Sequence, residues 1–473
     1  MTLNCAVIIA KNAEQAKTFA TEALAKGAEA LEFRLDAFSA IPDDFSFFAA
    51  DVPTIATFRS ESDNDRKETF DRALAAGADY IDIEAESNLR GIFPKEQVIC
   101  SYHNFETTPS VNVILTTVMD LKSSGIPKAA FMVWEPKDLI AIYDAAVILR
   151  NRGQPFILIG MGGEGEITRI RASDLGSFLN YCALKPELAS APGQLIIDEA
   201  VRLGKNPVVT GITGYPLTHT LSPDIQNAAF KAANIPGKYV KLPTIPGELY
   251  LIPDVIRKYR ITGINVTIPH KETIIPFLRK IDPLAKSAGA VNTIRNSPDG
   301  IEGFNTDITG ISASLALIDA HLKDANVLII GAGGAARGAV AYLIGEGARV
   351  SITNRTHFRA EELAQKFGAR AVRIAELKPG YTIIINATPA GMSGFENISP
   401  VPDNIFTKEC VVMDMIYDPE MTPFLTAAKA AGVRAAVSGK TMLIEQAAAA
   451  FTIWTGIQPD RDVMKKVFEE HLV

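Results

Sequence analysis

The sequence is poor in cysteine for its length. Its four thiols, Cys5, Cys100, Cys182 and Cys410, are scattered along 473 residues and never come in closely spaced pairs. Structural zinc sites need such paired spacing, and disulfide-dependent secreted proteins need a higher density of cysteines. The pattern therefore excludes a disulfide framework, predicts no metal site and favours buried free thiols.

Long apolar runs are also missing, although hydrophobic residues make up 47% of the chain. No apolar segment approaches the roughly 20 residues that a membrane-spanning helix needs, so no membrane span is expected. The opening segment, MTLNCAVIIAKNAEQAK, has no basic start before its short apolar run. It is typical of a strand and a helix rather than of a signal peptide, and we expect a cytoplasmic protein.

Positive charge is not in excess either. The formal net charge is -7, whereas a surface that binds nucleic acid needs clustered lysines and arginines. Small molecules are therefore the expected partners, and the sequence indicates no oligomeric state. The length suggests roughly two to four domains, so more than one active site is possible.

Short β-rich runs alternate with helical stretches up to about residue 204. The runs are AVIIA, ALEFRLD, TIATFR, YIDIEA, QVICSYH, AAFMVW, PFILIG and, less clearly, SFLNYCAL. Eight strands alternating with helices predict an α/β fold, a (β/α)8 barrel over residues 1–204. Polar side chains stand late in these runs, at Arg34, Asp36, Arg59, Glu84 and His103, where barrel enzymes place their chemistry.

A second α/β series begins at Val208, after the polar stretch VRLGKNP. We expect a substrate domain over 208–308, a dinucleotide-binding Rossmann domain over 309–438 and helices over 439–473 that return to the substrate domain. The block NVLII, GAGGAARG, helix and ARVSITNR has the order of a dinucleotide-binding unit. Its glycine turn comprises Gly331, Ala332, Gly333, Gly334 and Ala335.

The residues after the second strand of this unit favour NADP. Arg355 stands 24 positions after Gly331, where an NAD-selective fold more often has an acidic residue that binds the ribose. Arg355 and Arg359, with Asn354 and Thr356, can bind the 2′-phosphate of NADP instead.

Lys128, His103 and Glu84 form a candidate catalytic set in the barrel. A lysine in a partly apolar barrel loses some preference for its charged form, so its amine can attack a ketone. His103 can then move protons near neutral pH, with Glu84 fixing its tautomer. Each residue alone also has an ordinary structural explanation, and Lys128 stands at the beginning of its apolar run rather than at its end.

The barrel motifs resemble the type I 3-dehydroquinate dehydratases over most of residues 5–200. EFRLD, TFRS, DIE, SYHNF followed by TP, IPK, ITR and SAPGQ occur in that family's order. The resemblance implies Lys128 as the Schiff-base former, His103 as general acid and base, and Glu84 as its partner. It further implies hydroxyl-binding Glu32, Arg34 and Arg59, the carboxylate clamp Arg169, and Ser190 with Gln194 as a lid.

Lys271 in NVTIPHKE and Asp307 in GFNTD are candidates for the reduction of a carbonyl. Hydride addition leaves an alkoxide that needs a proton, and a lysine held by a carboxylate could supply it. The sequence does not say which of the two gives up the proton. Without further context, a lysine and an aspartate so far apart are ordinarily solvated surface residues.

The surrounding motifs reverse that interpretation, because they resemble shikimate dehydrogenase from about residue 208 to the end. GYPLTHTLSP, NVTIPHKE, AGAVNT, GFNTD, GAGGAARG, NRT, NATPAG, DMIY and GKTMLIEQA occur in order. The resemblance implies Lys271 and Asp307 as the catalytic pair, with His219 and His270 as scaffold. It also implies carboxylate-binding Thr220 and Ser222, hydroxyl-binding Asn265, Thr267, Asn292, Asp307 and Gln446, and Tyr417 as either a substrate contact or a packing residue.

The two resemblances predict consecutive reactions, the dehydration of 3-dehydroquinate and then the NADPH-dependent reduction of 3-dehydroshikimate to shikimate. Thr220 stands where the family usually has serine, and its extra methyl group leaves quinate open as an alternative substrate. A non-catalytic metabolite sensor built on the same folds is the other alternative.

Overall fold

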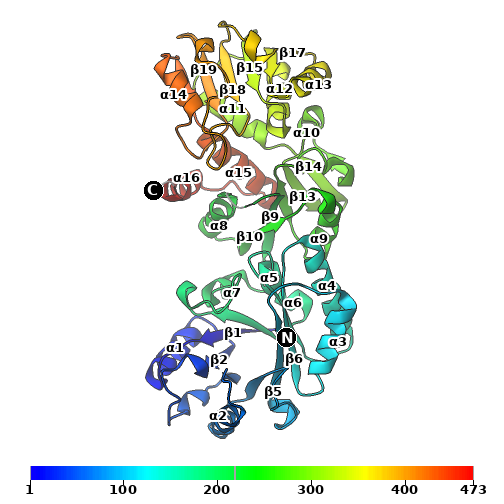
Figure 1. Cartoon of the computed structure of the whole chain (residues 1–473), viewed down its shortest axis with the longest axis vertical. Coiled ribbons are helices and arrows are strands. Elements are labelled where there is room, and N and C mark those ends of the chain that lie inside the picture. Colours follow the sequence, from blue (N-terminus) through cyan, green and yellow to red (C-terminus); the bar gives the residue numbers. More distant parts are fainter. Residues whose placement is uncertain (1, 218–219, 472–473) are drawn as a thin grey trace. The chain divides into compact units, whose positions relative to one another are not determined.

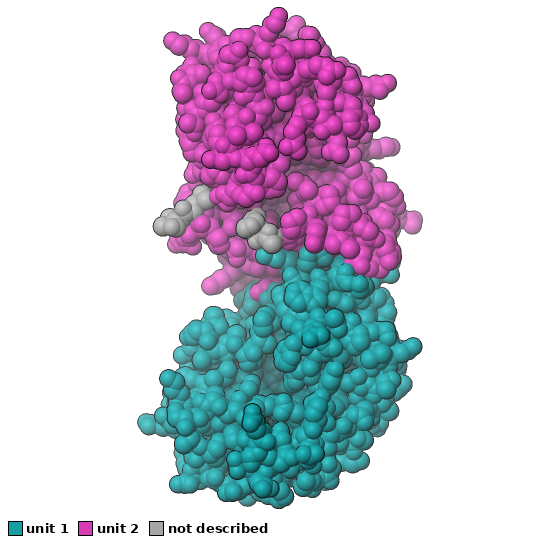
Figure 2. Space-filling model, in the orientation of Figure 1, with its two compact units in different colours: residues 1–208, 240–243, 254–260 teal, residues 209–239, 244–253, 261–473 magenta. Residues whose placement is uncertain are grey.

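The computed structural model describes residues 2–217 and 220–471 (Figure 1). His219, expected to be scaffold, lies outside these residues. By its internal contacts the chain divides into two compact units (Figure 2). Unit 1 comprises residues 1–208, 240–243 and 254–260, and unit 2 comprises residues 209–239, 244–253 and 261–473.

Unit 1 contains a barrel of eight parallel strands. Each strand pairs with the next one along the chain up to β7, and β8 pairs with β1, so the predicted (β/α)8 fold is confirmed. The strands are β1 Leu3–Ile8, β2 Ala30–Arg34, β3 Thr54–Thr57, β4 Tyr80–Glu84, β5 Val98–Asn104, β6 Ile126–Met132, β7 Ile157–Met161 and β8 Leu179–Ala183. The helices are α1 Ala13–Ala25, α2 Asp63–Ala75, α3 Val111–Leu121, α4 Pro136–Asn151, α5 Glu166–Ile170, α6 Ala172–Leu175 and α7 Ile197–Leu203.

Side chains alternate along each strand between the barrel interior and the surrounding helices. An apolar layer that includes Cys5, Ile55, Ile99 and Ile157 fills the interior near the start of the strands. Two residues further along the strands, the inward positions are largely polar. This second layer includes Glu32, Thr57, Asp82, Ser101 and Lys128.

The barrel has a seam between β7 and β8, which do not pair with each other in the described residues. On the β7 side, the Gly160 amide donates to Oγ1 of Thr168 at 2.9 Å. On the β8 side, the carbonyl of Tyr181 accepts hydrogen bonds from Arg169 Nη1 and Gln194 Nε2, both at 3.3 Å. Side chains therefore satisfy backbone groups that a neighbouring strand would otherwise bind.

The chain after the barrel contains a mixed six-stranded sheet in the order β10-β9-β11-β13-β14-β12. Its strands are β9 Val208–Gly214, β10 Gly237–Pro243, β11 Gly263–Val266, β12 Lys280–Ile281, β13 Thr293–Ser297 and β14 Gly300–Phe304. The accompanying helices are α8 Ser222–Ala232, α9 Ile252–Lys258, α10 Pro283–Ala288 and α11 Asp307–Leu317.

A parallel sheet in the order β17-β16-β15-β18-β19-β20 follows. This is the doubly wound Rossmann order. The chain adds strands toward one edge of the sheet from β15 and toward the other edge from β18, and a ligand crevice forms where this order reverses. The strands are β15 Asn326–Ile330, β16 Arg349–Thr353, β17 Arg370–Ala371, β18 Ile383–Asn386, β19 Val411–Asp414 and β20 Ala435–Val437. The helices are α12 Gly334–Gly345, α13 His357–Phe367 and α14 Pro423–Ala430.

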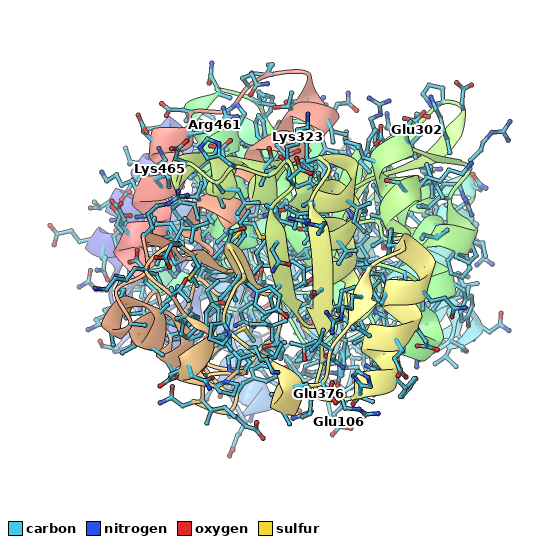
Figure 3. The ribbon with its side chains drawn as sticks, turned by 90° about the horizontal axis from the view of Figure 1, so that it is seen from above. Glu106, Glu302, Lys323, Glu376, Arg461 and Lys465 are labelled. Atoms are coloured by element: carbon cyan, nitrogen blue, oxygen red, sulfur yellow. The ribbon has the colours of Figure 1, made fainter. Side chains whose placement is uncertain are left out.

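The last two helices are α15, Lys440–Thr455, and α16, Arg461–His471. Helix α15 packs beside α11 (Figure 1), and its Trp454 Nε1 donates to the carbonyl of Ile294 in β13 at 2.9 Å. It therefore contacts the mixed sheet. Charged side chains such as Lys323, Glu376 and Lys465 lie on the outside (Figure 3).

All four cysteines are buried and free. None of the helices in the described residues is both long enough and apolar enough to span a bilayer. The same residues hold no group of three or more His, Cys, Asp or Glu side chains that could bind a metal ion.

Two candidate active sites

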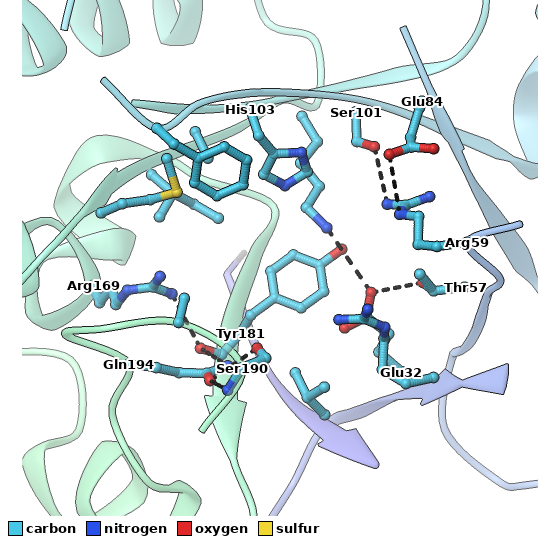
Figure 4. A pocket seen from close by; sticks show the side chains of 18 of the residues that line it. Glu32, Thr57, Arg59, Glu84, Ser101, His103, Arg169, Tyr181, Ser190 and Gln194 are labelled. Carbon is cyan, nitrogen blue, oxygen red and sulfur yellow. Dashed lines mark hydrogen bonds and ion pairs between the residues drawn. The ribbon is translucent and has the colours of Figure 1, made fainter. Parts of the chain in front are cut away.

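A cavity of about 420 Å³ occupies the barrel (Figure 4). Every barrel residue to which the resemblance assigns a role lines it, so the structure brings these residues together in one place. They are Glu32, Arg34, Arg59, Glu84, His103, Lys128, Arg169, Ser190 and Gln194. Asp36, which the sequence also singled out, is not among the lining residues and accepts hydrogen bonds from Arg34 instead.

Lys128 is the third residue of β6 and is only 6% exposed. The strand begins at Ile126, earlier than the apolar run suggested, because Pro127 and Lys128 both belong to it. Its Nζ lies 2.9 Å from Oδ2 of Asp82 and 4.1 Å from the centroid of the Tyr181 ring. The amine is therefore held inside the barrel rather than at the end of a strand.

Asp82 is a functional candidate that the sequence interpretation missed. It is fully buried, and its Oδ1 accepts hydrogen bonds from Arg59 Nη2 and Ser101 Oγ, both at 2.6 Å. Burial alone would raise the pKa of this carboxyl, but Lys128 and Arg59 hold the pKa well below its ordinary value. Asp82 is therefore ionised and serves as the counter-ion of Lys128.

His103 is held as a neutral imidazole. Burial lowers its pKa to about 4, and the nearby cation Lys128 acts in the same direction. Its ring stacks on Phe105 with the centroids 5.9 Å apart. A neutral imidazole at physiological pH can accept a proton.

The predicted pairing of Glu84 with His103 is not formed. The Glu84 carboxylate lies 3.5 Å from Arg59 Nε and 3.5 Å from Arg66 Nη1 instead, and within the described residues no hydrogen bond joins it to His103. Two long guanidinium side chains reach the carboxylate across neighbouring elements, and their charge attracts it more strongly than a neutral ring does.

Arg169, from α5, is a buried guanidinium at the cavity wall, 6% exposed. It donates to the carbonyl of Tyr181, but its Nε has no hydrogen-bond partner among the described residues. Burial lowers the pKa of Arg169 to about 10. A buried cation without an anion is costly, and a bound carboxylate would offset that cost with two hydrogen bonds.

The segment after β8 covers the cavity next to Arg169. Ser190 Oγ donates to Oε1 of Gln194 at 3.0 Å. The intervening Gly193 has φ +74°, and a Cβ there would lie 2.1 Å from the carbonyl oxygen of Gly162. Only glycine fits this turn, which fixes Ser190 and Gln194 at the cavity.

In unit 2, Lys271 and Asp307 form an ion pair, with Nζ 2.6 Å from Oδ2. Oδ1 of Asp307 accepts a hydrogen bond from Asn292 Nδ2 at 2.8 Å. Asp307 begins α11 and Lys271 follows β11, so the two elements bring together residues that are distant in sequence. Both side chains are largely buried, and an ammonium held by a carboxylate in this way could bind or protonate an oxygen.

Buried polar side chains extend from this pair. Asn292 hydrogen-bonds Thr306, which contacts Thr293, and Thr293 contacts Asn265. Tyr239, which the sequence did not single out, donates to Asn265 at 2.7 Å. These contacts join three of the predicted site residues, Asp307, Asn292 and Asn265, through bridges that no motif had indicated.

The other predicted residues of this site have contacts outside the hydrogen-bond network around Asp307. Thr220 Oγ1 accepts the amide of Ser222 at 3.3 Å, and Gln446 donates to Leu443 within its own helix. Tyr417 packs edge to face on Phe468. His270 Nε2 lies 2.6 Å from the carbonyl of Thr244 and is buried, as expected for scaffold.

A cavity of about 960 Å³ adjoins Lys271 and Thr267 at the crevice of the parallel sheet. All nine predicted cofactor-binding residues line it, and they are Gly331, Ala332, Gly333, Gly334, Ala335, Asn354, Arg355, Thr356 and Arg359.

The glycine turn of this cavity fits a phosphorylated dinucleotide. Gly331 has φ +119°, and a Cβ there would lie 2.9 Å from the carbonyl oxygen of Ala387. Gly333 is the N-cap residue of α12 and provides no side-chain cap, so the first amides of the helix can bind phosphate. Arg355 is 88% exposed with only a distant contact, 3.9 Å, to Glu396. It can therefore turn toward an anion.

Models of four protein families match the chain. They are described as type I 3-dehydroquinase (residues 4–204), shikimate dehydrogenase substrate binding domain (212–294), shikimate/quinate 5-dehydrogenase (314–397) and shikimate 5′-dehydrogenase C-terminal domain (439–467).

Individual relatives agree with these matches. A shikimate dehydrogenase (NADP(+)) from Carboxydothermus hydrogenoformans is 42% identical over 56% of this chain and 98% of its own. The solved shikimate 5-dehydrogenase of Thermus thermophilus, in complex with NADP(H) and shikimate, has a TM-score of 0.52 and 34% identity, over 56% of this chain and 99% of its own.

One relative spans both halves. The chloroplastic bifunctional 3-dehydroquinate dehydratase/shikimate dehydrogenase of Arabidopsis thaliana is 32% identical over 99% of this chain and 85% of its own length. This chain therefore belongs to the family of bifunctional 3-dehydroquinate dehydratase/shikimate dehydrogenases.

Proposed function

We propose that the two cavities catalyse consecutive steps of the shikimate pathway. The barrel, residues 1–204, dehydrates 3-dehydroquinate to 3-dehydroshikimate, and residues 208–473 reduce that product to shikimate with NADPH. The dehydrogenase part divides into a substrate domain (208–308), a cofactor domain (309–438) and returning helices (439–473). The observation that carries the proposal is the buried Lys128 beside a neutral His103 and a buried guanidinium, Arg169, whose Nε has no hydrogen-bond partner among the described residues.

The dehydration begins when the substrate carboxylate binds Arg169. The Lys128 ammonium passes one proton to the neutral His103, and the resulting amine attacks the ketone carbon; the same proton then leaves with the carbonyl oxygen as water. A C–N bond forms and water leaves, which gives an iminium ion whose charge faces Asp82. His103 takes a proton from the carbon next to the iminium, and the electrons of that C–H bond move toward the nitrogen.

The β-hydroxyl then leaves with a proton returned by the imidazole, and water hydrolyses the new imine. One water is consumed in that hydrolysis and one was released on imine formation. The net reaction is therefore the loss of a single water from the substrate.

The reduction uses Lys271 and Asp307. NADPH, when bound, supplies the hydride to the substrate carbonyl carbon. The Lys271–Asp307 pair binds the carbonyl oxygen and protonates it as it becomes a hydroxyl. Asn292 fixes the Asp307 carboxylate, and Asn265, Thr267 and Gln446 bind substrate hydroxyls. The glycine turn would hold the pyrophosphate of bound NADPH, and Arg355 and Arg359 would bind its 2′-phosphate.

The direct test is to supply 3-dehydroquinate and NADPH and to measure shikimate. Borohydride added with 3-dehydroquinate should leave a reduced adduct on Lys128, whereas a metabolite sensor would form none. Lys128→Ala should abolish dehydration and spare reduction, and Lys271→Ala should do the reverse. Loss of both activities from either change, in folded protein, would contradict independent sites.

Thr220 favours a second candidate substrate for the reduction. Its Oγ1 keeps the hydroxyl that a serine would provide, but its methyl group trims the space for the substrate. Turnover of shikimate and quinate with NADP and NAD separates the two. A larger kcat/KM for quinate would assign the second site to quinate.

We also propose that the enzyme works in the cytoplasm with small-molecule substrates as its partners. Four buried free cysteines suit a reducing compartment, although the Arabidopsis relative is described as chloroplastic. Cell fractionation with an antibody against the chain tests the location, and recovery in an organelle would contradict it.

A further inference from the structure

Tyr181, in β8, has a buried hydroxyl group with no hydrogen-bond partner among the described residues. Its side chain is 4% exposed and lines the barrel cavity. In Figure 4 its ring extends into the space that Glu32, His103 and Arg169 surround. No sequence motif had indicated this residue, and the proposed mechanism does not use it.

An unpaired buried hydroxyl is costly, by about 1–3 kcal/mol, and native structures rarely keep one without a reason. A phenylalanine would fill the same space without that cost. The nearest carboxylates already have donors, since Thr57 donates to Glu32 at 2.7 Å and Lys128, Arg59 and Ser101 donate to Asp82. The phenol is thus left facing the cavity with its proton to donate.

The protonation state supports a donor role. Burial raises the pKa of Tyr181 well above its ordinary value, and the charges of Glu32 and Asp82 add to the effect. The phenol is therefore neutral throughout the physiological range. It can give a hydrogen bond but does not act as a base.

The position of the ring shows which part of a ligand it can reach. The Lys128 amine lies over the ring, 4.1 Å from its centroid. A substrate carbon bonded to that amine stays over the same ring, so oxygens on or beside this carbon come near the phenol. We infer that the Tyr181 hydroxyl is a substrate-binding group that donates a hydrogen bond to such an oxygen. The inference rests on the proposed dehydration.

The test compares Tyr181→Phe with a matched control, Tyr80→Phe. Tyr80 lies at the start of β4, packs edge to face on Phe178 and does not line the cavity. Both changes remove one phenol oxygen from the same barrel. The measurements are the dehydratase kcat/KM, the rate at which borohydride traps the Lys128 adduct, and the melting temperature.

Tyr181→Phe should lower the dehydratase kcat/KM and the trapping rate about tenfold, the loss of one hydrogen bond of ~1.4 kcal/mol. Its melting temperature should stay equal or rise, because an unsatisfied hydroxyl is removed. Tyr80→Phe should change neither rate.

Two results would contradict the role of Tyr181, and a third would contradict the proposed dehydration on which it rests. It fails if Tyr181→Phe keeps kcat/KM within about twofold of the unchanged protein, well below the effect of one hydrogen bond. It also fails if the melting temperature of Tyr181→Phe drops together with its activity, since packing then explains the loss. If the unchanged protein forms no Lys128 adduct, the proposed dehydration itself is wrong.

Discussion

Replacing Asp82 by Asn removes the negative charge that faces Lys128 while keeping the size of the side chain. In the structure this carboxylate lies 2.9 Å from the Lys128 amine and 2.6 Å from Arg59 Nη2. The substitution leaves both cations buried against a neutral amide. Removing one partner of a buried ion pair costs about 3–5 kcal/mol, and here that cost is divided between folding and catalysis.

The part of this cost that slows catalysis depends on the charge of the reaction intermediate. The iminium nitrogen on Lys128 carries a positive charge at the place where Asp82 provides the counter-charge. Losing a preorganised electrostatic partner of this kind lowers kcat by about 10²–10³-fold, equivalent to ~2.7–4 kcal/mol. We expect Asp82→Asn to fall in that range for dehydration.

The assay follows the absorbance of the conjugated enone product, together with the mass of the borohydride adduct. Reduction of 3-dehydroshikimate by the same sample should be unchanged, which shows that the second site is intact. Asp79→Asn is the matched control, because Asp79 comes immediately before the same strand and is exposed. Dehydration by Asp82→Asn within about threefold of the unchanged protein, far short of the expected loss, would refute the counter-ion role.

The remaining predictions concern other parts of the two sites. Dehydratase kcat/KM should hold from neutral pH down to about 5 and fall toward pH 4, because the pKa of His103 is lowered by burial to about 4 and the protonated ring cannot accept a proton. The free energy of unfolding, measured by urea titration, should fall as the pH drops from 6.5 to 4, because the unfolded chain protonates His103 more readily than the native state does. His103→Asn should make this fall smaller. Arg355→Ala should raise KM for NADPH about tenfold or more while leaving NADH unchanged, and an equal change for both cofactors would contradict 2′-phosphate binding. Gly334→Ala places a Cβ 3.1 Å from the Lys271 side chain, so dehydrogenase kcat should fall about tenfold with dehydration intact.

Much of the fold follows from periodicity. Eight β-rich runs separated by helices predict the barrel, and the glycine turn between two strands predicts the Rossmann unit. The convergence of the barrel residues also follows from pattern, because alternate positions of parallel strands face the same interior. Asp82 precedes Glu84 by two residues on β4 and could have been found in this way.

The sequence predicted less well which side chains contact each other. The sequence suggested Glu84 as the partner of His103, but Arg59 and Arg66 take its carboxylate. Which of several long side chains reaches a given group depends on distances between strands that no motif contains. The unpaired hydroxyl of Tyr181 is likewise visible only once its neighbours are placed.

In the dehydrogenase half, motif order suggested that Lys271 and Asp307 act together, and the two side chains are in contact. It did not reveal Thr293 and Thr306, which link Asn265 to Asn292, or Tyr239, which donates to Asn265. All three are ordinary buried residues by type, and their function depends on which polar groups the sheet places beside them.

The unpaired edges of β7 and β8 make part of the barrel wall responsive to its contents. Arg169 and Gln194 both bind the Tyr181 carbonyl on β8, and both also face the cavity. A ligand that draws either side chain toward itself weakens that attachment without breaking a backbone ladder. The rate of amide hydrogen exchange along Leu179–Ala183 should therefore change when a ligand binds in the barrel cavity, and it can be measured without turnover or an attached label.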